Sequence, residues 1–405
     1  MSGRTAMPRA WRGLPQVRVL VDDATIPRAD ARALSHIRIL RRLCQPTYCE
    51  LALDTTAAAS PTDRLFEPGV SLTILDRADA VLFSGEVTGL RQHFGGSRVR
   101  RLCVTAFDPL HRLRKRQSIR AFPELNAVEL AEHLVQDMGI HVDCETPGPV
   151  WAGLAQWDQS DLAFLDETAR RVGLYFSLEG DRLSLVRSDG HDETLDLELG
   201  DSLLDADLSA SFEPACRDMS VHAWDPWRAN GCTVGHAEAE ALPESAFDPA
   251  VFDANAARAD ANALLQSTRQ AEALARAELD RRIAGERRLH AVAVGNAALR
   301  PGVGVRLSNT LGRWSGRYMV ASVTHVLDRE AGFRSIIDSA LPAPPPARTG
   351  TVTTLGRVLD ADDPDGAGRV RVRLPAYADM ETRWLSVLTP GAGPGKGLIS
   401  VPDRD

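Results

Sequence analysis

Two stretches of this chain repeat one order of turn residues and strands. The first, "EPGVSLTILDRADAVLFSGEVTGLRQHFGGSRVRRLCVTAFD", starts at Glu67, and the second, "RPGVGVRLSNTLGRWSGRYMVASVTHVLDREAGFRSIIDSA", starts at Arg300. Each runs through Pro-Gly-Val, a strand, a turn, Ser-Gly, a long strand, a Gly-containing turn and a closing strand. A chance match of turn chemistry is one explanation, and an internal duplication that places two related β-barrels in one chain is the interpretation we prefer. It equates Pro68-Gly69 with Pro301-Gly302 and Ser84-Gly85 with Ser315-Gly316.

The first repeat lies within a run of short strands between residues 17 and 113. The predicted strands are "VRVLV", "IRILRRL", "YCELALD", "VSLTILD", "AVLFSGEVTGL" and "RRLCVTAFD". Glycine and acidic turns separate them, and regularly spaced short strands of this kind favour a barrel or a sandwich.

Helical segments separate the two repeats. Asn126 with Glu129 three residues later predicts a capped helix over 126–139, and Ser160 caps a second over 160–173. A hairpin from Leu174 to Val186 follows, so residues 121–190 read as a small α/β unit. A third, longer helix is predicted at about 255–285, where Ala, Leu, Arg and Glu predominate.

A further β region follows the proline-rich segment "LPAPPPARTG". Arg357–Asp360 and Arg369–Leu374 predict an antiparallel hairpin, in which Gly366 and Gly368 supply positive-φ turn positions. The alternation in the hairpin predicts a set of core-facing residues, namely Val358, Val370, Val372 and Leu374. The short remainder holds few strands for a β domain, so we expect the chain to stop inside one.

Charge and hydropathy exclude several classes of protein. A formal net charge of −8 opposes binding to a nucleic-acid backbone, for which basic residues supply the affinity. The apolar runs are too short to span a bilayer, and the N-terminus lacks a signal-peptide core, so we expect cytoplasmic synthesis. The six scattered cysteines predict reduced, mostly buried thiols rather than a disulfide framework.

Two motifs invite a functional interpretation. "PGAGPGKGL" resembles a phosphate-binding loop, but Pro390 and Gly397 occupy positions that require Gly and Ser or Thr, so a plain connection between strands is favoured. Two Cys and two His form a common zinc ligand set, and this chain has one candidate: Cys216, His222, Cys232 and His236. Its spacing lacks the usual close Cys pair, and the competing interpretation is a strand and loop with ordinary side chains.

The segment "HRLRKRQSIR" (His111 to Arg120) is the one dense basic cluster. It could meet a polyanion, but in an acidic chain we favour a solvated or subunit-contact face. No hydrolase, zinc-protease or Cys-His nucleophile signature is present, and no carboxylate pair can be singled out. We therefore predict no catalytic, cofactor-binding or metal-binding residues and no cofactor.

Several segments, taken in order, resemble one family. "VTAFDPLHRLRKRQSIRAF", "NAVELAEHLVQDMGI", "QSDLAFLDETARRVGLYFSLEGDRLSLV" and "VGNAALRPGVGVRLSNTLGRWSGRYMVASVTHVLDREAGFRS" are similar to the phage late-control D and VgrG proteins, the hub and spike components of contractile injection systems. The segment from Gly356 onward resembles the start of the spike-base domain of these proteins, an oligonucleotide/oligosaccharide-binding (OB) fold. The resemblance covers roughly residues 80–405. The N-terminal 60 residues of the chain match least well, and they look closer to phage-tail-like extracellular injection systems than to the type VI secretion members.

The resemblance implies a mainly β fold with α/β insertions, in which two duplicated tube-like β-barrels precede the start of an OB-fold domain. The expected domains, in chain order, are a first barrel at 1–120, an α/β insertion at 121–190, a second barrel at 191–340 containing the long helix, a linker at 341–352 and an incomplete OB domain at 353–405. Because family members continue into a β-helical needle, we expect that this chain was cut within the OB domain.

The resemblance also implies a non-enzymatic function. We expect a homotrimer that adapts a sixfold inner tube to a threefold piercing spike, with the hexameric tube protein, baseplate proteins and a spike tip protein as partners, and with neither nucleic acid nor a membrane span. It would assemble into a phage-tail-like particle that can be deployed outside the cell. The alternatives are a spike with a cell-wall-degrading module beyond residue 405, and an OB-fold single-strand binder, for which Tyr377 and Trp384 are the only OB-domain aromatics.

Overall fold

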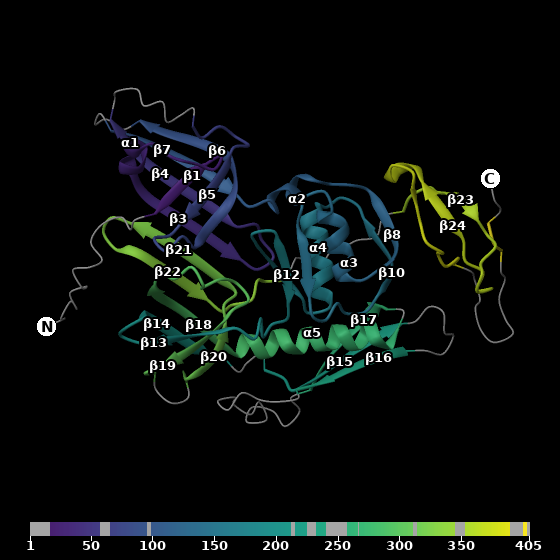
Figure 1. The fold of residues 1–405 in the computed structure, drawn as a ribbon. Helices are drawn as coiled ribbons and strands as arrows, with labels where there is room; N and C mark the ends of the chain where they lie inside the picture. The colour runs from purple at the N-terminus through teal and green to yellow at the C-terminus, as the bar shows by residue number, and fades with distance from the viewer. Residues whose placement is uncertain are drawn as a thin grey trace. The chain divides into compact units, whose positions relative to one another are not determined.

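The chain folds into two compact units, shown as a ribbon in Figure 1. The computed structural model describes residues 17–56, 65–94, 99–211, 215–224, 232–239, 257–265, 267–310, 314–344, 353–388 and 400–402. The first unit comprises Met1–Arg112, Tyr175–Glu213 and Ala284–Pro342, and the second comprises Leu113–Leu174, Pro214–Ile283 and Ala343–Asp405.

The first unit is almost entirely β. Its elements are β1 (Arg18–Val21), β2 (Ala24–Thr25), α1 (Arg28–Ala33), β3 (Leu34–Arg42), β4 (Tyr48–Thr56), β5 (Ser71–Leu75), β6 (Val81–Phe94), β7 (Val99–Phe107), β11 (Tyr175–Glu179), β12 (Arg182–Val186), β13 (Thr194–Glu198), β14 (Leu203–Ala210), β18 (Arg287–Val294), β19 (Gly304–Ser308), β20 (Gly316–Met319), β21 (Ser322–Asp328) and β22 (Gly332–Asp338). All six strands predicted between residues 17 and 113 are confirmed, as is the hairpin β11–β12.

The second unit mixes helices and short sheets. Its elements are α2 (His111–Lys115, which begins in the first unit), β8 (Arg120–Leu125), α3 (Ala127–Val135), β9 (His141–Cys144), β10 (Trp151–Gln156), α4 (Asp161–Arg171), β15 (Asp218–Trp224), β16 (Cys232–Glu238), β17 (Ala257–Leu264), α5 (Thr268–Glu286, which ends in the first unit), β23 (Arg357–Asp360), β24 (Arg371–Leu374), the 3-10 helix η5 (Pro375–Tyr377) and β25 (Met380–Glu381).

An eleven-stranded sheet organises the first unit. Its strand order is β14-β18-β22-β21-β3-β4-β7-β6-β5-β1-β2, so strands from both sequence repeats share one sheet. The junction is the antiparallel pair β21–β3, in which Val326 lies opposite Arg38; Figure 1 shows these two strands side by side.

The two repeats have the same strand pairing at constant numerical offsets. The pair Leu90–Val104 in β6–β7 corresponds to Val323–Ile337 in β21–β22, an offset of 233 for both members. β3–β4 corresponds to β14–β18, where Ile39–Cys49 matches Leu208–Leu289. Even the register irregularities coincide: one falls between Leu34 and His36, and the other between Leu203 and Asp205. We call the strands β3 to β7 the first repeat and β14 with β18 to β22 the second repeat. A bulge retained at the same place is the mark of a duplicated backbone.

The Pro-Gly turns are equivalent, as predicted. Gly69 has φ +94° and donates its N–H to the carbonyl of Val87, and Gly302 has φ +91° and donates to the carbonyl of Val320. A positive φ at this turn explains why both repeats carry glycine there.

The predicted match of the two Ser-Gly pairs is wrong by two residues. Leu72 pairs with Gly85, and at the same offset Val305 pairs with Tyr318, so Gly316 stands instead where the first repeat has Phe83. The reason is local packing. A Cβ on Gly85 would lie 2.2 Å from the carbonyl oxygen of Phe107, so this glycine serves a close approach in its own repeat.

The repeats differ most at their long strand. β6 runs unbroken through a register shift between Val87 and Gly89, whereas the second repeat breaks into β20 and β21 at the corresponding residues, Val320 and Ala321. The break places β19 and β20 in a separate sheet with β13, while β21 stays in the large sheet.

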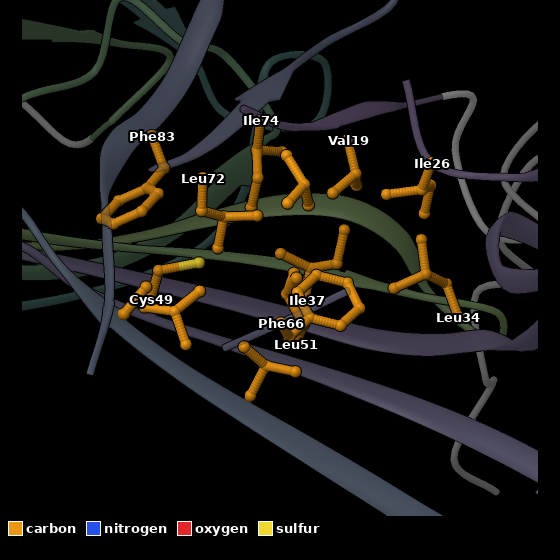
Figure 2. Close-up of a cluster of buried hydrophobic side chains, with 14 of the residues drawn as sticks. Val19, Ile26, Leu34, Ile37, Cys49, Leu51, Phe66, Leu72, Ile74 and Phe83 are labelled. Carbon is orange, nitrogen blue, oxygen red and sulfur yellow. The ribbon is translucent and has the colours of Figure 1, made fainter. Parts of the chain in front are cut away.

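Each repeat has its own hydrophobic core. Figure 2 shows the first, in which Ile37, Leu51, Phe66, Leu72 and Phe83 are fully buried among their neighbours. The second core contains alanines and smaller aliphatic residues, listed here with their larger companions: Leu289, Ala291, Ala293, Val305, Leu307, Tyr318, Val323 and Ile337. Burial of such side chains is the main stabilising contribution to both repeats.

The two shorter predicted helices of the second unit are confirmed with their caps. Asn126 accepts hydrogen bonds from the N–H groups of Val128 and Glu129, and Glu129 accepts from the Asn126 N–H, which is a capping box. The Ser160 hydroxyl accepts from Ala163 N–H at the start of α4. The first helix ends at Val135, earlier than predicted, and a turn continues to Gly139 at φ +66°.

The long helix begins later than the sequence analysis predicted. Residues 257–264 form β17, parallel to β15, and α5 starts only at Thr268. The Ser267 hydroxyl accepts from Gln270 N–H and caps the helix. α5 packs on the sheet at Gly235 of β16, where a Cβ would lie 2.0 Å from the carbonyl carbon of Ala271. Pairing with β15 therefore overrides the helix propensity of the alanine-rich segment before Ser267.

The C-terminal hairpin is confirmed. β23 and β24 pair antiparallel, with Val358 opposite Val372, and Gly366 and Gly368 have φ +64° and +68°. Of the four predicted core-facing residues, Val370 is buried, and Val358, Val372 and Leu374 are half-buried.

Candidate assembly interface

Apart from the two-residue strand β2 at one end of the large sheet, two longer strand edges lack a partner strand in the described part of the chain. One is residues 89–94 of β6, which pair with β7 only, and we call it the first-repeat edge. The other is the outer side of β14 at residues 205–210, which pair with β18 only, and we call it the second-repeat edge. Open edges are templates for pairing with another chain.

The exposure of the first-repeat edge contrasts with its counterpart. Leu90 and Phe94 are 41% and 63% exposed, whereas their equivalents in β21, Val323 and Leu327, are fully buried. The difference follows from pairing, because β21 has β3 as a second neighbour and this part of β6 has none among the described strands. Exposed large apolar side chains on an open edge indicate an interaction surface.

Three arginines of the basic cluster from His111 to Arg120 form ion pairs within the chain, namely Arg112, Arg116 and Arg120. Arg112 donates to both carboxylate oxygens of Glu86 at 3.0 and 2.7 Å. In the second unit, Arg116 donates to Asp137 at 2.9 and 2.6 Å, and Arg120 lies 2.8 Å from Asp161. These ion pairs neutralise part of the cluster, and its assignment as a solvated or subunit-contact face stays a prediction.

Glu86 and Asp108 have shifted pKa values of opposite sign. Hydrogen bonds from Arg112, together with buried His111, lower the pKa of Glu86 to about 2. Burial raises the pKa of Asp108 to about 6, although its carboxylate accepts the N–H groups of Thr47 at 2.7 Å and Leu110 at 3.0 Å. Asp108 joins the end of β7 to the start of β4, which is a structural role.

Among the described side chains, the zinc candidates Cys216, His222 and His236 do not form a group with metal-like geometry. Within the described residues, the one group with metal-like geometry is Asp218, His236 and Glu238, which shares only His236 with the predicted set. His236 lies 3.3 Å from each carboxylate across β15 and β16, so the group reads as exposed ion pairs. The side chain of Cys232 lies outside the described residues. The five described cysteines are free and four are buried, as predicted.

Arginines of the OB-domain hairpin pair with acidic residues of the same domain. Asp363 accepts from Arg369 Nε at 2.8 Å and from the N–H of Ala367, and these bonds lower its pKa. Arg373 donates to Glu381 at 2.8 Å. Tyr377 packs edge-on against Trp157, with ring centroids 6.4 Å apart. The glycine-rich segment of residues 390–398 lies outside the described residues.

None of the described helices has both the length and the apolar character needed to cross a membrane. The strand edges were not anticipated from the sequence. For the first-repeat edge, the sequence signal is the pair of apolar residues in "GLRQHF", which extends the strand beyond the part that pairs with β5.

The fold and these edges define a mainly β assembly protein built from a duplicated sheet and an OB domain. Residues 41–331 match the family model of the phage tail baseplate hub (GPD), and residues 354–405 match that of the type VI secretion system/phage-baseplate injector OB domain. Because the first match covers well over half of the chain, the protein belongs to the phage tail baseplate hub family. None of the curated proteins matches it in sequence.

Solved structures have the same fold at low sequence identity. The 43 kDa tail protein of prophage MuSo2 from Shewanella oneidensis is 14% identical with a TM-score of 0.61, covering 80% of this chain and 98% of that protein. The tail protein from Neisseria meningitidis MC58 is 13% identical with a TM-score of 0.56, covering 80% and 95%. The E. coli c3393 protein, a component of the type VI secretion system, is 13% identical with a TM-score of 0.59, covering 89% and 88%. The family is one of structural hubs of tail-like particles, in agreement with the resemblance.

Proposed function

We propose that three copies of this chain form a closed ring that joins a sixfold inner tube to a threefold spike. The observation that carries the proposal is the duplication: each chain contains two repeats with the same strand register, already joined edge to edge through β21 and β3. Three chains then supply six similar positions, which matches a hexameric tube. The OB domain begins the threefold side.

The function is mechanical and involves no turnover. Docking of a strand edge relies mainly on backbone hydrogen bonds and shape, so it tolerates different side chains in the two repeats. Six linked contacts act together through effective concentration, which makes the docked ring far more stable than one contact. The partners are the inner tube protein, baseplate proteins and a spike tip protein, within a tail-like particle.

Stoichiometry tests this proposal. Light scattering of the full chain should give the mass of a trimer. The subunit interfaces of such an obligate trimer are expected to bury over ~2,000 Å². Native mass spectrometry with the hexameric tube protein of the same particle should give three hub chains for six tube subunits. A stable monomer at micromolar concentration, or a complex with six hub chains, would contradict it.

A further inference from the structure

We propose that the first-repeat edge of one chain pairs as an antiparallel ladder with the second-repeat edge of the next chain, with His93 opposite Asp207. The inference rests on the proposed trimer and names its subunit contact. It uses only residues of the first unit.

The register follows from the pairing seen inside the chain. β21 and β3 are joined with Val326 opposite Arg38 and Val323 opposite Arg41. Subtracting 233 from a residue number in β21 gives the equivalent residue of the first-repeat edge. Adding 169 to a residue number in β3 gives the equivalent residue of the second-repeat edge. The translated ladder places its residues in the following pairs: Leu90 with Ala210, Arg91 with Ser209, Gln92 with Leu208, His93 with Asp207, and Phe94 with Ala206.

The backbone groups of the second-repeat edge point the right way. Ser211 donates its N–H to the carbonyl of Glu286, the residue before β18. Backbone groups alternate in direction along an antiparallel strand, so Asp207 and Ser209 also face β18. Ala206, Leu208 and Ala210 therefore direct their N–H and C=O groups to the open side.

The first-repeat edge follows the same rule. Asp108 donates its N–H to Thr47, which directs Ala106 and Val104 toward β4 and leaves Thr105, Cys103 and Arg101 facing β6. Their partners Gly89, Arg91 and His93 thus bond to β7. The intervening residues, Leu90, Gln92 and Phe94, present N–H and C=O groups outward. The same alternation holds at the junction inside the chain, where Leu43 next to β3 donates its N–H to the carbonyl of Ala321 next to β21.

Charge favours this partner over an unrelated one. The second-repeat edge carries exposed Asp205 and Asp207, and the first-repeat edge carries exposed Arg91 and His93. In this register Arg91 lies diagonally across from Asp207, and opposite charges at neighbouring cross-strand positions are favourable. The two edges differ, so the contact is head-to-tail, the type that can close into a ring.

A disulfide tests the register. The backbone N–H and C=O groups of His93 and Asp207 point toward β7 and β18 of their own chains. Across the seam the two residues therefore form a non-hydrogen-bonded pair, whose Cα atoms lie about 4.5 Å apart. This distance is within the range for a disulfide. The double variant H93C/D207C of the full chain should be oxidised and analysed on a denaturing gel without reductant. Most of the 44.0 kDa chain should then migrate as a covalent trimer. The matched control H93C/D205C is two residues out of register and should cross-link at least severalfold less, and each single variant should give no trimer.

The outcomes separate this inference from the trimer itself. If light scattering shows a trimer but H93C/D207C stays monomeric on the gel, or cross-links no better than H93C/D205C, the seam is wrong and the proposed function stands. If the unsubstituted chain is a monomer, both fall.

A proline supplies a second, independent test. Gln92 is exposed and its N–H faces the open side, so Gln92→Pro removes a seam donor on an edge where proline is tolerated. We expect Q92P to dissociate the trimer at concentrations where Gln92→Ala, which keeps the N–H, does not, with both retaining the circular dichroism of the parent. A Q92P variant that stays trimeric at the dissociation midpoint of the parent overturns the seam.

Discussion

The two repeats share a backbone but fill it differently. Leu51 and Leu53 of the first repeat correspond to Ala291 and Ala293 of the second, and all four are buried. Conversely, Gly85 corresponds to Tyr318, whose ring fills the second core and whose hydroxyl donates to the Trp314 carbonyl at 3.0 Å. The larger core side chains thus lie on β4 in the first repeat, whereas in the second repeat the equivalent strand β18 carries alanines and β20 carries the large side chain. The comparison teaches that the register of the strand ladders, which the proposed ring of six positions requires, has been retained while core side chains have been redistributed.

The largest expected effect tests whether both repeats belong to one cooperative unit. Ile74 and Leu307 occupy equivalent positions and are both buried. Ile74→Ala and Leu307→Ala should each lower the free energy of unfolding by about 2–5 kcal/mol, because each leaves a cavity. Denaturant titration should show one shared transition moving in both variants. Leu355→Ala, at an 89% exposed residue, is the control; a variant that moves only a separate transition would divide the sheet into two units.

The glycine that breaks the Ser-Gly correspondence gives the next effect. Gly85→Ala places a Cβ against the backbone of Phe107 and should cost about 1–3 kcal/mol through overpacking. Gly89→Ala, four residues along the same strand, meets nothing closer than 3.8 Å and has no positive φ, so its melting temperature should hardly change. Equal effects in the two variants would mean that the close approach at Gly85 is not needed.

Asp108 distinguishes the first repeat by its response to pH. Its folded pKa of about 6 lies above the unfolded value, so the folded state binds the proton more tightly. Its contribution is therefore full below about pH 4 and is lost as pH rises to about 6, by about 1–3 kcal/mol. Glu86, whose pKa is lowered to about 2, acts oppositely, between about pH 4.5 and 2.

The test measures the unfolding free energy of the parent and Asp108→Asn between pH 4 and 7. The variant should lose this slope, although it also loses an acceptor for one of two N–H groups. Parallel curves would assign the slope to other residues.

The smallest effect compares the turns of the OB domain with those of the repeats. Gly366, Gly368 and Gly69 all have positive φ and open space around the missing Cβ. Valine at any of them should cost about 1 kcal/mol or more through backbone strain alone. Thermal melting of G366V and G368V should show reductions similar to that of G69V. An unchanged melting temperature in both OB-domain variants would exclude this turn geometry in solution.

Much of the fold could be predicted because it depends on local chemistry. Alternating strands, the capping box at Asn126, the Ser160 cap and glycines at positive φ act within a few residues, and all were confirmed. The domain boundaries at residues 120, 190 and 340 stay predictions. The predicted start of the long helix was wrong because pairing with another strand outweighed local helix propensity. Residues of β17 form a strand in a helix-favouring segment because β15 lies alongside them.

The sequence by itself determined that the chain is duplicated, mainly β and poor in signatures of catalysis, because turn residues and periodicity are written in neighbouring positions. Only the tertiary structure decided the true register between the repeats, the displacement of Ser84-Gly85 from Ser315-Gly316, and the burial of Val323 against the exposure of Leu90. These depend on which strand lies beside which, and β3 and β21, nearly three hundred residues apart, pair through backbone groups that every sequence contains.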